Sequence, residues 1–218
     1  MQLRTGQSLL LLSHARNVAA ANDTGWASIV ESLLESVYPE LGIRVDALSY
    51  ATVTDGLTQP VWMDVARNRR PEWLVMPPLT RADLSTLMPD EATRTPERLK
   101  HSLLRMLHEL SMYAERVVLF TPFDLTASDG NDFAPFEAAV LEAASEAGCM
   151  LVSVKSALDE TKIKHACQPD RANDDALHTD IEFALANAFL RSVGFQWLRR
   201  PSFFSMADQT KLRVSHTS

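Results

Sequence analysis

Four consecutive leucines, Leu9–Leu12, constrain the fold of this chain more than any other feature. A short apolar run without alternation is typical of a β-strand that is buried on both faces, and such strands belong to parallel sheets covered by helices. The small and polar residues that follow separate this strand from a helical pattern that opens at Trp26. Open α/β sheets bind their ligands just beyond the carboxyl ends of the strands, so we expect any chemistry to lie at Ser13–Asn17.

The rest of the chain alternates between short apolar runs and amphipathic stretches, which predicts an α/β fold with a parallel sheet. In the amphipathic stretches apolar residues recur three and four positions apart, as on one face of a helix. Asp23 or Thr24 is the expected N-cap of the first helix. The predicted strands are Leu9–Leu12, Ile43–Leu48, Trp73–Met76, Arg116–Thr121 and Cys149–Val154, and the predicted helices are Trp26–Val37, Thr58 to before Pro71, Pro96–Leu110, Phe133–Ala147 and Asp174–Val193.

Net charge and cysteine content exclude several classes of function. The formal charge of −7 argues against a binder of nucleic acid, because neutralising phosphates requires clustered Lys and Arg. The two cysteines show no metal-ligand spacing, and Cys149 lies in an apolar run that predicts a buried thiol. No run of about 20 apolar residues predicts a membrane span, and Leu9–Leu12 is too short for a signal peptide. We expect a soluble, cytoplasmic protein without metal or cofactor.

The order of these elements and the loops between them resemble the SGNH (GDSL-type) hydrolases, over roughly residues 8–194. Members of this superfamily carry four short blocks on loops above a five-stranded, flavodoxin-like α/β/α sandwich. Gly-Asp-Ser after the first strand supplies the nucleophile, and Ser13-His14-Ala15 stands in its place. Supporting features are Gly25-Trp26 at the first helix and Pro71–Val75 at the entry to the third strand.

The other three blocks also depart from the family pattern. The glycine block after the second strand corresponds to Val53–Gly56, so Asp55 and Gly56 stand at oxyanion-equivalent positions. Gly-x-Asn-Asp after the third strand corresponds to Leu79–Ala82, which places Arg81 in the slot of the oxyanion asparagine. Asp-x-x-His before the last helix corresponds to Asp170–Asn173. There the aspartate is kept and an asparagine replaces the histidine.

The resemblance implies an ester hydrolase whose catalytic groups are missing. Alanine at position 15 cannot attack a carbonyl, and Asn173 cannot accept and return a proton near neutral pH. We therefore predict a catalytically degenerate protein, a pseudoenzyme kept as a binding or assembly module. With its histidine gone, Asp170 is expected to pair with Arg81 across the crevice.

Two alternatives stay open for the catalytic groups. Ala15 could be an engineered replacement of a natural serine. Otherwise the chain is a divergent esterase or acyltransferase whose groups have moved to Ser13, His14 or His178. Asp174 and His178 are spaced i, i+4 but lack the further ligands that a metal needs. A nucleotide-binding flavodoxin-like protein is the weakest hypothesis, because no Gly-rich phosphate loop is present.

A C-terminal extension, residues 195–218, follows the predicted domain of residues 1–194. Large apolar residues in it are mixed with Arg199-Arg200-Pro201, and one exposed patch of such residues would be costly in water. The extension is expected to pack back on the domain or to bind a protein partner or a second copy. A small acyl or anionic ligand is the other expected partner. The aromatic residues concerned are Phe195, Trp197, Phe203 and Phe204.

Overall fold

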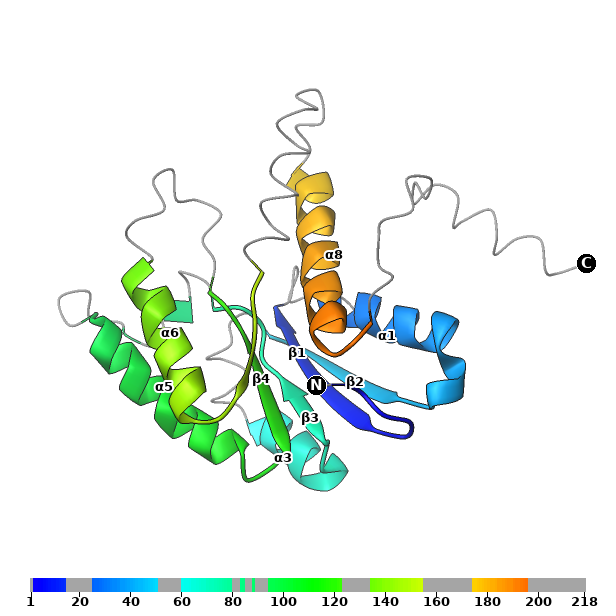
Figure 1. The fold of residues 1–218 in the computed structure, drawn as a ribbon, viewed down its shortest axis with the longest axis horizontal. Helices are drawn as coiled ribbons and strands as arrows, with labels where there is room; N and C mark the ends of the chain where they lie inside the picture. Colours follow the sequence, from blue (N-terminus) through cyan, green and yellow to red (C-terminus); the bar gives the residue numbers. More distant parts are fainter. Residues whose placement is uncertain are drawn as a thin grey trace, which may run out of the picture.

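A computed structural model describes residues 2–14, 25–50, 60–79, 83–84, 88, 94–122, 134–154 and 174–195 of the chain. Five parallel strands form one sheet in the order β2-β1-β3-β4-β5 (Figure 1). This is the flavodoxin-like order of open α/β folds, with its topological switch point between β1 and β3. The strands are β1 (Ser8–His14), β2 (Arg44–Tyr50), β3 (Trp73–Val75), β4 (Arg116–Phe120) and β5 (Met150–Val152).

Helices cover both faces of the sheet, which gives the predicted three-layer α/β/α architecture (Figure 1). Helices α1 and α8 pack against each other on one face, and α5 and α6 pack against each other on the other face together with α3. The helices are α1 (Trp26–Val37), the short 3-10 helix η1 (Pro39–Leu41), α3 (Pro60–Arg69), α5 (Pro96–Leu110), α6 (Ala134–Glu146) and α8 (Asp174–Ser192).

Alternate leucines of β1 enter opposite halves of the core, as the pleat of a strand requires. Leu9 and Leu11 pack with Trp26 beneath α1 and α8, whereas Leu10 and Leu12 pack beneath α3, α5 and α6. All four leucines are at most 2% exposed. The expectation of a strand buried on both faces is confirmed.

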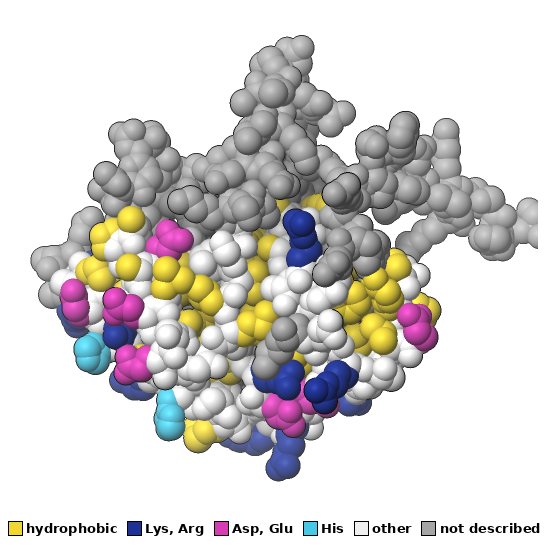
Figure 2. All heavy atoms as spheres, in the orientation of Figure 1, with side chains coloured by type: hydrophobic (Ala, Val, Ile, Leu, Met, Phe, Trp, Pro, Cys, Tyr) yellow, Lys and Arg dark blue, Asp and Glu magenta, His cyan; other side chains and the backbone are white. Residues whose placement is uncertain are grey.

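Surface hydrophobic side chains gather both at the end of the molecule formed by α1 and over α6 (Figure 2). Val37 of α1 is 42% exposed, and Leu33 and Leu41 are only partly buried. Within the described residues, no helix combines the length and the hydropathy needed to cross a membrane.

Two local expectations need correction. Helix α1 has Gly25 as its N-cap, so neither Asp23 nor Thr24 occupies that position. The reason is that the chain enters α1 through a glycine conformation, with φ 50° and ψ −130°, and a carboxylate from another helix meets the first turn. Cys149 is only half-buried, because it precedes β5 at the end of a turn, and burial raises the pKa of its thiol.

Candidate active site

The structure describes only some of the residues singled out in the sequence. Ser13 is described fully, and His14 and His178 are described at the level of the backbone. The other candidate positions lie outside the described residues, so their geometry and the expected Arg81–Asp170 pair stay predictions. These positions are Ala15, Asp55, Gly56, Arg81, Asp170, Asn173, Trp197, Phe203 and Phe204.

Ser13 is a buried hydroxyl near the end of β1. It is 2% exposed, and its Oγ makes no hydrogen bond to any of the described residues. Ser13 shares strand parity with Leu9 and Leu11, so its side chain lies on the face covered by α1 and α8. A buried hydroxyl without a partner is costly, and such groups often mark functional positions.

A carboxylate from α8 lies beside this hydroxyl. The backbone N–H of Trp26 donates a hydrogen bond to Oε2 of Glu182, 156 residues further along the chain. A Cβ built on Gly25 would lie 2.8 Å from this Oε2 and 3.1 Å from Ser13 Oγ. Both polar atoms therefore border the small space that Gly25 leaves open. Sequence reasoning missed Glu182, because no local pattern connects it to α1.

The first turns of α8 contain a second match to the family's last block. Asp175-Ala176-Leu177-His178 has the Asp-x-x-His spacing. It begins five residues after the start of Asp170–Asn173, the stretch assigned to this block because it precedes the last helix. His178 and Glu182 both lie on α8, so the backbone of His178 lies about one turn, roughly 6 Å along the helix axis, before that of Glu182. The spacing of the motif alone could have identified this second match.

Asp83 is a buried carboxylate that follows β3 in the sequence by eight residues. It is fully buried, and it takes part in a polar interaction. Burial of an unpaired carboxylate would be very unfavourable, so this interaction is what allows Asp83 to lie there. Its proximity in sequence to Arg81 makes it a residue of the third-block loop.

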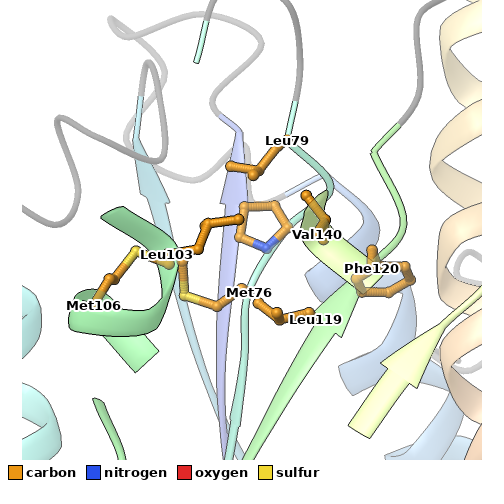
Figure 3. Close-up of a pocket in the computed structure, with 8 residues that line it drawn as sticks. Met76, Leu79, Leu103, Met106, Leu119, Phe120 and Val140 are labelled. Atoms are coloured by element: carbon orange, nitrogen blue, oxygen red, sulfur yellow. The ribbon is translucent and has the colours of Figure 1, made fainter. Parts of the chain in front are cut away.

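An apolar hollow lies on the other face of the sheet, between the ends of β3 and β4 and the helices α5 and α6 (Figure 3). Its lining contains no charged side chain among the described residues, and it is too narrow to admit a water molecule. Ser13 faces α1 and α8, so the hollow does not adjoin its hydroxyl. The lining residues are Met76, Pro77, Leu79, Leu103, Met106, Leu119, Phe120 and Val140.

The described residues contain no cluster of three or more His, Cys, Asp or Glu side chains that could hold a metal. The side chains of Asp174 and His178 are not among those described, so the structure does not test that pair.

Comparison with known proteins identifies relatives of the whole domain. An acetylxylan esterase of Geobacillus stearothermophilus is 27% identical over 192 residues, which are 81% of this chain and 84% of that protein. This match supports the resemblance to the SGNH-type hydrolases. No family model matches the chain.

Solved structures share the fold of this chain. LAE5, an alpha/beta hydrolase enzyme from the metagenome of Lake Arreo, superposes with a TM-score of 0.69 at 19% identity, over 88% of this chain and 97% of its own. A catalytic mutant of Axe2, an acetylxylan esterase of Geobacillus stearothermophilus, has a TM-score of 0.65 at 26% identity, over 92% and 100%. Catalytic mutants of Axe2 carry alanine in place of a serine, a histidine and an aspartate.

Proposed function

We propose that this protein is an ester hydrolase of the SGNH type that removes small acyl groups, with acetyl as the preferred group, from carbohydrate. The observation that carries the proposal is the match to an acetylxylan esterase over four-fifths of both chains. Only 2% of Ser13 is exposed, which favours a small acyl group over a long one. The apolar hollow lies on the opposite face of the sheet and offers no room to a longer chain beside Ser13.

In this proposal Ser13, His178 and Asp175 share the work of the family's triad. Oγ of Ser13 attacks the ester carbonyl while His178 takes its proton, and Asp175 orients the imidazole. The C–O bond to the sugar then breaks, and His178 returns the proton to the leaving hydroxyl. Water hydrolyses the acyl-serine in the same way, which releases the carboxylic acid and restores Ser13.

Acetate release from acetylated xylo-oligosaccharide and from 4-nitrophenyl acetate tests this function. We expect turnover by the wild type and a loss of about 10³-fold or more in kcat for Ser13→Ala and for His178→Ala. Ser36→Ala, an exposed serine on α1, is the matched control and should keep full activity. A wild type without turnover, or an active Ser13→Ala variant, contradicts the proposal.

A second function, binding of an acylated ligand without turnover, is favoured by Ala15. The catalytic serine that is mutated in Axe2 has the same residue number in its chain as Ala15 has here. In this case the wild type binds acetylated oligosaccharide in calorimetry without releasing acetate. With Asn173 at the position of the base, Ala15→Ser alone is expected not to restore turnover. Restored turnover would instead identify His178 as a working base.

A further inference from the structure

We propose that Glu182 is a positioning residue that holds the end of β1 and the start of α1 against α8. The inference rests on the proposed function in one respect, namely that Ser13 near the end of β1 is the nucleophile of the ester hydrolysis. No family block contains Glu182, which lies about two turns into the last helix.

The first link is the hydrogen bond from the Trp26 N–H to Glu182 Oε2. The first N–H groups of a helix have no partner within it, and its N-terminus attracts negative charge. The N-cap of α1 is Gly25, which has no side chain to meet this need. Glu182 therefore supplies from α8 the carboxylate that other helices obtain from a local Asp or Glu.

The second link is the space at Gly25. Glu182 Oε2 and Ser13 Oγ lie within 2.8 Å and 3.1 Å of the same point, where a Cβ of residue 25 would stand. The two atoms therefore border the same small space, and Ser13 Oγ has no hydrogen-bond partner in the part of the chain that the structure describes. A shift of the carboxylate consequently changes the shape of the space that the hydroxyl borders.

The third link is the position of His178 one turn before Glu182 on α8. A carboxylate that fixes α8 against the first residue of α1 also fixes the distance from Ser13 to the helix turn that carries His178. Because about 1 Å of misplacement can cost 10²-fold in rate, this contact should affect kcat more than substrate binding.

Steady-state kinetics of Glu182→Ala and Glu182→Gln, with Glu109→Gln as control, test the inference. Glu109 is exposed on α5, on the other face of the sheet. We expect kcat of Glu182→Ala to fall about tenfold or more with KM within threefold. Glu182→Gln keeps an oxygen acceptor for Trp26 N–H and should recover part of this loss. The control should match the wild type.

Hydrogen exchange of the Trp26 amide, measured on the same variants, gives a second and activity-independent readout. Exchange should accelerate about fivefold or more in Glu182→Ala, as expected for a lost helix cap, and less in Glu182→Gln. Unchanged exchange, unchanged kcat/KM, or a loss of kcat that only follows the unfolded fraction would overturn the inference. If the wild type shows no turnover, the proposed function fails, and the exchange result alone decides whether Glu182 holds α1 and β1 against α8.

Discussion

Replacement of Gly25 by alanine should destabilise the protein by about 2–4 kcal/mol. The residue has φ 50° and ψ −130°, a conformation that is essentially restricted to glycine and costs other residues about 1–3 kcal/mol. The new Cβ would lie 2.8 Å from Glu182 Oε2, 3.1 Å from Glu182 Cδ and 3.1 Å from Ser13 Oγ. Displacement of Glu182 would then add the loss of the cap on α1, about 1 kcal/mol.

Urea unfolding of Gly25→Ala and Gly148→Ala separates the two contributions. Gly148 also has a positive φ, 68°, but no atom of the described residues lies within 4 Å of the point where its Cβ would stand, so its alanine variant carries backbone strain alone. At about 2–4 °C per kcal/mol, we expect Gly25→Ala to lower Tm by roughly 4–16 °C, clearly more than the control. The double variant Gly25→Ala with Glu182→Ala should be less than additive. Equal losses for the two glycine variants would refute the reasoning about the shared space.

Four other perturbations have defined expected outcomes. Ser13→Ala should change the free energy of unfolding by no more than about 1 kcal/mol in urea titration, since the hydroxyl has no partner to lose among the described residues; a larger loss would reveal a hidden partner. The hydroxyl of Ser8, and to a smaller extent its backbone N–H, donate hydrogen bonds to Glu72 and lower the pKa of this carboxyl group. The ionised carboxylate therefore contributes stability at pH values above its unfolded pKa of 4.5, and this stability is lost as the pH falls through the folded pKa. Glu72→Gln should therefore unfold with a flatter pH dependence on the acid side of pH 5, and an unchanged acid profile by circular dichroism would contradict this. Leu103→Ala, at 1% exposure, should cost about 2–5 kcal/mol, against less than about 0.5 kcal/mol for the exposed control Leu141→Ala, and equal chemical-denaturation midpoints would argue against the core position. Truncation after Phe195 should lower the mass seen by light scattering, or cause aggregation, if the extension mediates association; a soluble protein of unchanged mass and Tm would show that it does not.

The periodicity of the sequence predicts the parallel α/β class and the described helices and strands, whereas the five-stranded flavodoxin-like sheet follows from the resemblance to the SGNH hydrolases. Helix α1 has the predicted bounds, and the described strands begin and end within two residues of the predicted ones. The reason is that strands buried on both faces and helices with one apolar face leave strong local signals. Among the described elements, η1, a single 3-10 turn at Pro39–Leu41, had no predicted counterpart.

The candidate site was less predictable because its contacts join distant parts of the chain. Local capping rules favoured Asp23 or Thr24 at the start of α1, whereas the carboxylate that meets Trp26 comes from Glu182. Motif matching by position favoured Asp170–Asn173 and passed over the same spacing at Asp175–His178. Which carboxylate meets the start of α1 depends on the packing of α8 against α1, and sequence alone does not show that packing.

The contact between the two ends of the described domain has a practical consequence. The N–H of Leu3 donates to the carbonyl of Val193 at 3.2 Å, and Gln2 lies against Gly194. Residues 2–3 precede the amino end of β1, and Val193 follows the last turn of α8, so both ends meet at the edge of the sheet opposite Ser13. A tether attached near either end would therefore fix the molecule to a surface with its carboxyl edge facing the solution. A short peptide bridge between the two ends would allow a circular permutant to open elsewhere.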